Sequence, residues 1–175
     1  MALSRRDQLR RVALLCAHFM RNLAYHREGR DNGRYLLRRT EFWITVNGNF
    51  LDACILEWSK LFGTTGSDKK GSHYWKKAVS DNARFEREMF MQINHAQFDQ
   101  MFEEARKYRN QFVAHLDDEK VGYIPHLDIA EDAVRFYYGY ICQNEVKPGD
   151  LFGLPADLDD YYRECAREAR RIYRP

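Results

Sequence analysis

Apolar and polar positions follow the period of an α-helix along most of the chain. The clearest case lies between positions 96 and 116, where apolar residues recur at intervals of three, four and one. They are Phe98, Met101, Phe102, Ala105, Tyr108, Phe112, Val113 and Leu116. Side chains three and four positions apart share one face of a helix. The pattern therefore predicts an amphipathic helix over residues 96–116.

The same spacing predicts helices in other parts of the chain. We expect them over about 4–27 (capped by Ser4), 35–62, 72–80 (capped by Ser72), 85–91 and 128–144, with a last helix of about 15 residues that begins at Asp157. Glycine-containing loops separate several of them, and the alternation typical of strands is nearly absent. We predict an all-α bundle, a single domain over 1–175, with the long second helix at its centre.

Within that second helix, Asn47, Gly48 and Asn49 are poor helix formers. They interrupt an otherwise wide apolar stripe. The interruption indicates either a kink or a close contact with another backbone.

The composition supports a packed protein without a strong overall charge. Apolar residues make up 45% of the chain and aromatic residues 14%, which is enough for a core. Because 28 basic residues face 26 acidic ones, the net charge is only +2. This excludes a polycation but permits a local basic patch.

Cysteine usage and hydropathy indicate a cytoplasmic protein. The four cysteines lie far apart in helical patterns, without a C-x-x-C pair, as expected for reduced, buried thiols. The N-terminal apolar run is short, is interrupted by His18 and lacks a cleavage motif, so we interpret it as a helix and not as a secretion signal. No apolar run approaches the roughly 18 residues of a membrane span.

The predicted helix over 96–116 carries the sequence "RNQFVAH", with Arg109, Asn110 and His115 beside its apolar face. The arginine fork matches a phosphate and stays charged, whereas histidine exchanges protons near neutral pH. Asparagine can hold a phosphate oxygen or orient the imidazole. These groups suffice to cut RNA without a metal, because the 2′-hydroxyl of the substrate is the nucleophile.

The spacing of this motif has a consequence for assembly. Six residues of helix correspond to about 600° of rotation and about 9 Å of rise, so Arg109 and His115 point about 120° apart. Two copies of the helix that face each other across a two-fold axis bring both groups to one site. The alternative is structural: an arginine, an asparagine and a histidine near a helix end are ordinary, and the helix dipole favours His⁺ there.

The motif resembles the Arg-(x)4–6-His signature of the HEPN superfamily, with a polar residue after the arginine. "YRNQFVAHLDD" at 108–118 is similar to the form found in the abortive-infection branch of that superfamily. "LEWSKLFG" at 56–63 and "HYWKK" at 73–77 also resemble elements of related members. The resemblance covers most of the chain in architecture and about 25 residues in sequence.

The resemblance implies a helical bundle that dimerises through its motif helices. It implies a metal-independent endoribonuclease, with Arg109 and His115 catalytic and Asn110 in support, acting in phage defence or as a toxin. An antitoxin or a nucleotidyltransferase is a partner in some such systems. Because many HEPN domains have lost cleavage, the alternative function is a catalytically silent module that binds RNA or protein.

Further residues are candidates with a weaker signal. Asp117 follows the motif and is expected to cap the helix exit or to pair with His115. The histidines and acids show no metal-ligand spacing, so we expect no metal and no cofactor. Basic residues suited to an RNA backbone are Lys76, Lys77, Arg163, Arg167, Arg170 and Arg171, with "SRRDQLRR" at 4–11.

Two structural interpretations stand beside these basic candidates. Tryptophans beside Lys60, Lys76 and Lys77 can stack on bases. They are also ordinary core residues with lysines at the rim. The arginines of the last helix equally fit its dipole, because its acids come first.

Overall fold

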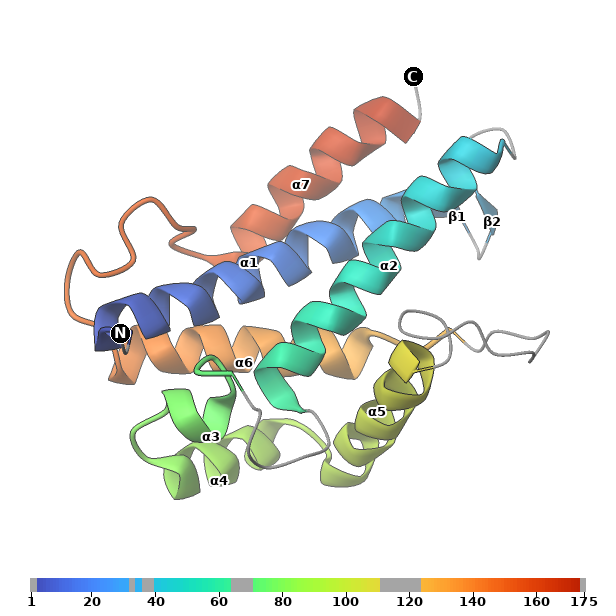
Figure 1. The fold of residues 1–175 in the computed structure, drawn as a ribbon. Coiled ribbons are helices and arrows are strands. Elements are labelled where there is room, and N and C mark those ends of the chain that lie inside the picture. The colour runs from blue at the N-terminus through green and yellow to red at the C-terminus, as the bar shows by residue number, and fades with distance from the viewer. Residues whose placement is uncertain (1–2, 32–33, 36–39, 64–70, 111–123, 174–175) are drawn as a thin grey trace.

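A computed structural model describes residues 3–31, 34–35, 40–63, 71–110 and 124–173 (Figure 1). Within these ranges the chain forms seven α-helices and one pair of two-residue strands. They are α1 (Arg5–Glu28), β1 (Arg30–Asp31), β2 (Arg34–Tyr35), α2 (Glu41–Phe62), α3 (Trp75–Ala78), α4 (Asn82–Gln92), α5 (His95–Tyr108), α6 (Asp128–Asn144) and α7 (Leu158–Tyr173). The predicted all-α class is confirmed.

The first helix, and not the second, lies at the centre of the bundle. Helix α1 packs against α2, α6 and α7, and Figure 1 shows it between α2 and α7. Its buried positions include Val12, Cys16, Phe19 and Leu23, spaced by three and four residues. The prediction of a central second helix is wrong because a wide apolar stripe indicates burial without indicating which helix is surrounded.

Polar side chains cap several helices at their N-terminal ends. The hydroxyl of Ser4 accepts the backbone N–H of Asp7 at 3.1 Å, as predicted. Asp81 and Asn94 begin α4 and α5 in the same way. Ser72 does not cap α3, which begins at Trp75 after Tyr74. Such caps satisfy backbone donors that have no partner inside the helix.

The start of α2 differs from the prediction. Tyr35 pairs with Arg30 in the short antiparallel ladder of β1 and β2, and the helix begins only at Glu41. The expected extension of the helix back to position 35 is therefore wrong. Residues 36–39 lie outside the described ranges.

Of the two interpretations of the interruption at 47–49, a kink or a close contact with another backbone, the structure shows the close contact, at Asn47. Its side-chain amide is buried and donates to the backbone oxygen of His26 at 3.0 Å, while Nδ1 of His26 lies 3.1 Å from the backbone oxygen of Asn47. Gly29 adjoins this contact: a Cβ there would lie 2.3 Å from the Asn47 amide nitrogen. The two helices therefore approach closely at this end of the bundle.

Aromatic side chains fill much of the core between α2, α4, α5 and α6. The ring of Trp58 lies 5.5 Å from that of Phe62 and 5.7 Å from that of Phe98. The Phe85 ring meets that of Tyr137 at 5.2 Å. Burial of each such side chain stabilises the fold by roughly 1.5–3 kcal/mol. This packing fixes α5 against the rest of the protein.

The three tryptophans agree in part with their core interpretation. Trp58 and Trp75 are buried. Trp43 is half-buried at the start of α2, with its ring 5.7 Å from that of Tyr173 in α7.

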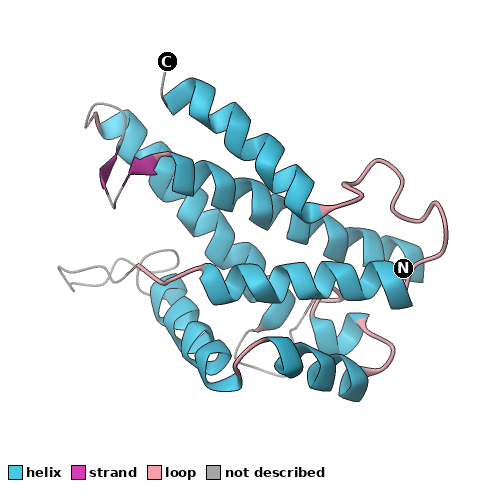
Figure 2. Cartoon of the chain, turned by 180° about the vertical axis from the view of Figure 1, so that it is seen from behind, coloured by secondary structure: helices cyan, strands magenta, loops and turns pink. Residues whose placement is uncertain are grey.

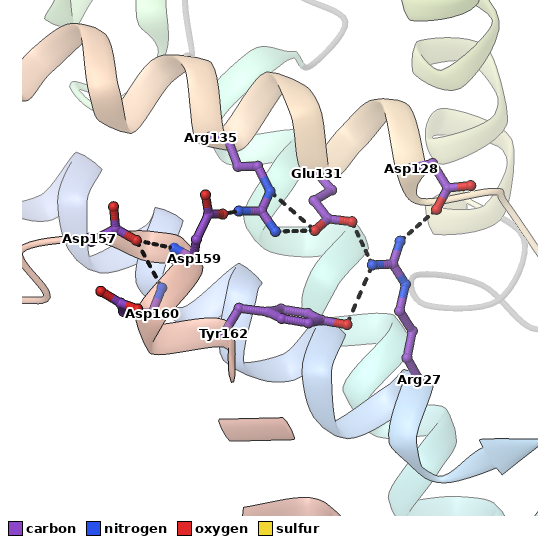
Figure 3. Close-up of polar contacts among 8 residues, drawn as sticks. All are labelled: Arg27, Asp128, Glu131, Arg135, Asp157, Asp159, Asp160 and Tyr162. Atoms are coloured by element: carbon purple, nitrogen blue, oxygen red, sulfur yellow. Dashed lines mark hydrogen bonds and ion pairs between the residues drawn. The ribbon is translucent and has the colours of Figure 1, made fainter. Parts of the chain in front are cut away.

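A polar network joins α1 and α6 to the start of α7 (Figure 3). The carboxylate of Glu131 accepts from Arg27 at 2.5 Å and from Arg135, and Arg27 also contacts Asp128 at 2.6 Å. Arg135 forms a further ion pair with Asp159. Seen from behind, α6 crosses the bundle beside α5 (Figure 2). None of the helices in the described ranges is long and apolar enough to cross a membrane.

Candidate functional site

The helix that carries the predicted catalytic motif is α5. Its buried residues Phe98, Met101 and Ala105 are spaced by three and four, which confirms the amphipathic pattern. The first two turns pack against the Trp58 and Phe62 rings of α2. The last turn leads to Arg109 and Asn110, which follow the helix.

A hydrogen bond between helices holds the end of α5. The hydroxyl of Tyr108 donates to Oδ1 of Asp52 in α2 at 2.7 Å. Both side chains are partly buried. The bond fixes the residue that immediately precedes Arg109, so the position of the motif depends on α2 as well as on α5. Sequence reasoning missed Asp52, although an acid inside the apolar pattern of a helix is a visible signal.

Arg109 and Asn110 form a local pair. Oδ1 of Asn110 accepts from Nη2 of Arg109 at 3.0 Å and from Nε at 3.3 Å. Arg109 is half-buried and Asn110 is exposed. The amide thus orients the guanidinium, while both N–H groups of Nη1 are outside this contact. A guanidinium group held in one orientation suits the binding of a phosphate.

The backbone changes its helical form at these two residues. Arg109 and Asn110 lie in a wider π-helical turn that follows α5, and the N–H of Arg109 contacts the carbonyl oxygens of both Ala105 and Arg106. Short π-helical turns are frequent at functional sites. Asn110 also lines a surface groove of about 410 Å³ with Glu103, Glu104, Arg106 and Lys107.

His115 and Asp117 lie outside the described residues, as does the predicted continuation of the helix to residue 116. The structure therefore places the arginine and the asparagine of the motif beside each other. The distance from Arg109 to His115 remains a prediction of the sequence.

The predicted RNA-binding residues lie on separate parts of the protein. Lys76 and Lys77 are exposed on α3, whereas the four arginines are exposed on α7, and Figures 1 and 2 both show these helices on opposite sides of α1. The ammonium group of Lys76 lies 4.8 Å from the centre of the Trp75 ring. These residues do not form one continuous surface.

Carboxylates already form ion pairs with part of the arginine stripe of α7, which consists of Arg163, Arg167, Arg170 and Arg171. Arg170 makes two hydrogen bonds to Glu28, at 2.6 and 2.8 Å, and Arg163 pairs with Asp160. These contacts reduce the positive charge that the stripe offers to a ligand. Arg163, Arg167 and Arg170 nevertheless line a groove of about 470 Å³ along the helix.

A cluster of titratable groups between α1 and α2 was not predicted. The buried carboxylate of Glu57 accepts from the amide of Asn22 at 3.1 Å and lies 3.6 Å from Nδ1 of His18. Burial raises the pKa of Glu57 to about 7, against the opposing effects of Asn22, Lys60 and Arg21. The signal in the sequence is a glutamate between the apolar residues of "ILEWSKLF".

The described residues contain no group of three or more histidines, cysteines or acids placed to hold a metal ion. All four cysteines are free thiols; Cys16, Cys54 and Cys165 are buried and Cys142 is half-buried, in agreement with the prediction for reduced cysteines. Burial raises the pKa of the Cys16 and Cys54 thiols, so neither is an activated nucleophile.

Comparison with known proteins gave no relative: no family model, no curated protein and no solved structure matches this chain.

Proposed function

We propose that the chain is a metal-independent endoribonuclease of HEPN type. The proposed reacting groups are Arg109 and Asn110, which follow α5, and His115, with Asp117 as a supporting residue. The observation that carries the proposal is the pair of hydrogen bonds by which Asn110 orients the half-buried guanidinium of Arg109. The motif order and the helical bundle around it are the further support.

The reaction needs only the substrate and these side chains. The 2′-hydroxyl of the RNA attacks the adjacent phosphorus, and the bond from phosphorus to the 5′-oxygen breaks. His115 takes the proton from the 2′-hydroxyl or returns one to the leaving 5′-oxygen. Arg109 stabilises the negative charge that grows on the phosphate oxygens. The products are a 2′,3′-cyclic phosphate and a 5′-hydroxyl.

The proposal includes a homodimer with two equivalent clefts, each using groups from both chains. The sequence supports this arrangement, because a regular α-helix would place positions 109 and 115 about 120° apart. The proposed role is a phage-defence or toxin–antitoxin effector in the cytoplasm, whose activity an antitoxin or a nucleotidyltransferase restrains.

The test is cleavage of RNA with EDTA present. We expect the wild type to cut and Arg109→Ala to lose about 10²-fold or more of the activity, because a preorganised charge that stabilises the transition state is removed. Arg84→Ala is the matched control: this arginine is exposed on α4, away from the motif, and pairs with Glu88. Activity that EDTA abolishes, or an equal loss in both variants, would overturn the proposal.

A further inference from the structure

Basic groups come from three segments that pack together beside the contact between α1 and α2. They are Arg11, His18 and Arg21 of α1, Lys60 of α2 and His73, which precedes α3. Burial and the nearby charges of Arg21 and Lys60 lower the pKa of His18. Burial and the charges of Lys60 and Arg11 lower the pKa of His73. Lys60 lies one turn after Glu57 on α2, and Glu57 lies 3.6 Å from Nδ1 of His18, so the geometry of the helix also places Lys60 on the side of α2 that meets His18.

The packing of α1 explains why these groups meet. The side chain of Gln8, one turn before Arg11, donates to the backbone oxygen of Ser72 at 2.6 Å and so brings this helix to the segment that contains His73. Arg11 and His18 are seven residues apart, which places them on the same face of α1 at a separation of about 10 Å along its axis. We call Arg11, His18, Lys60 and His73 the α1–α2 basic face.

The two strong cations of this face are not neutralised. Within the described residues, neither Arg11 nor Lys60 forms an ion pair, and both are exposed. The other arginines near the start of α1 are engaged. Arg5 pairs with Glu145, Arg6 with Asp150, and Arg10 donates to two backbone oxygens of the loop before α7.

The acid at the edge of this face adds little negative charge below neutral pH. Glu57 is the carboxylate nearest to His18, at 3.6 Å, and its pKa is raised to about 7 by burial. When pH falls, Glu57 gains a proton and the histidines become able to carry charge. The positive character of the α1–α2 basic face therefore increases as the pH falls.

We propose that the α1–α2 basic face binds the phosphodiester backbone of an RNA strand, and that it does so more strongly than the arginine stripe of α7. The identity of the ligand as RNA rests on the proposed function. Unpaired, exposed cations release counterions when they bind phosphates. On α7, Arg163 and Arg170 are held by Asp160 and Glu28, and the groove that Arg167 lines also contains the carboxylates of Asp160 and Glu164, which repel a phosphate. The face comprises residues of α1, of α2 and of the segment before α3, whereas Arg109 and Asn110 follow α5.

The experiment measures binding without cleavage. A fluorescent single-stranded 2′-O-methyl RNA lacks the nucleophile and cannot be cut by the proposed reaction, and fluorescence anisotropy gives its affinity over a series of salt concentrations. The test variant is Arg11→Gln with Lys60→Gln. The matched control is Arg167→Gln with Arg171→Gln, which removes two exposed charges from α7 that form no ion pair within the described residues.

We expect the test variant to bind about tenfold more weakly. Its slope of log affinity against log salt should fall by about 1.4, because each lost contact to a single strand contributes about 0.7. The control should change affinity by less than about twofold, and Arg11→Lys with Lys60→Arg should restore binding. All variants change exposed side chains, and circular dichroism verifies their folding.

Three results would overturn the proposal: no binding by the wild type, an unchanged affinity in the test variant, or equal losses in the test and control variants. The last result would indicate a response to net charge alone. Binding by the α1–α2 basic face together with no cleavage of unmodified RNA would contradict the proposed ribonuclease and leave this inference standing.

Discussion

Burial favours the uncharged forms of two side chains, Glu57 and His26. Burial raises the pKa of Glu57 from 4.5 to about 7 and lowers that of His26 from 6.5 to about 4. Glu57 accepts a hydrogen bond from the side-chain amide of Asn22, and Nδ1–H of His26 donates one to the backbone oxygen of Asn47, so both partners are uncharged. Removing such groups from water costs less when they are neutral, so folding changes their affinity for protons.

The effect of pH on Glu57 has a definite sign. Between pH 4.5 and 7 the folded protein keeps a proton on Glu57 that the unfolded chain has lost, so this group stabilises the fold at low pH and the contribution disappears as the pH rises through about 7. Relative to Glu57→Gln, the free energy of unfolding of the wild type should fall by about 3 kcal/mol between about pH 4 and about pH 8. Urea unfolding of both proteins across this range measures the difference.

Comparing the two proteins cancels the titration of groups that they share. His26 acts in the opposite direction, because its contribution is lost as the pH falls from 6.5 toward 4. If the free energies of unfolding of the wild type and Glu57→Gln changed in parallel with pH, the pKa of Glu57 would be the same in the folded and unfolded states. That result would contradict the prediction.

The contact between α1 and α2 depends on a small residue at Gly29. Its φ of −73° is accessible to any amino acid, so the backbone conformation does not require glycine there. The close approach of neighbouring side chains does require glycine, because an added Cβ would lie 2.3 Å from the amide nitrogen of Asn47 and 2.9 Å from the Tyr173 ring. The ends of α1, α2 and α7 therefore meet at this point.

We predict that Gly29→Ala lowers the free energy of unfolding by about 1–3 kcal/mol, because the added methyl group forces Asn47 and Tyr173 to move. In an Asn47→Ala background the same change should cost less, since one of the two obstacles is gone. Denaturant unfolding of the four proteins in this double-mutant cycle gives the coupling. Costs that simply add would contradict the proposed contact.

The sequence predicts elements best where one strong periodic pattern has clear ends. The range 128–144 matches α6, because Asp128 begins an uninterrupted spacing of inward residues. The predicted start of α2 at position 35 was wrong, because Leu36 and Leu37 continue the apolar spacing. A pattern along one segment cannot show that Tyr35 pairs with Arg30. Pairing between segments depends on tertiary structure.

The same distinction applies to the candidate site. Arg109 and Asn110 are adjacent in the sequence, and their local contact needs only one helix end. The groups that come from another helix were missed. Asp52 reaches Tyr108 from α2, and Glu57 reaches Asn22 across the α1–α2 contact. Periodicity assigns faces to a helix but does not identify which faces meet.

At the scale of the whole molecule, the proposed chemistry requires a second chain. If residues 109–115 continue as a regular α-helix, as the sequence predicts, Arg109 and His115 point about 120° apart. One helix would then not easily direct both toward one phosphorus, whereas two facing copies would. Each site would then use the arginine of one chain and the histidine of the other. This claim separates a shared dimeric ribonuclease from a monomeric one and from a silent binding module.

The most direct measurement of this claim mixes two inactive variants. Arg109→Ala and His115→Ala, each assayed alone on RNA in EDTA, should show almost no cleavage. After subunit exchange, half of the dimers pair one variant with the other, and each such dimer has one intact site. We predict recovery of about a quarter of the wild-type activity. A mixture that exchanges subunits, as native mass spectrometry would show, and yet stays inactive while the wild type cuts would contradict the shared site.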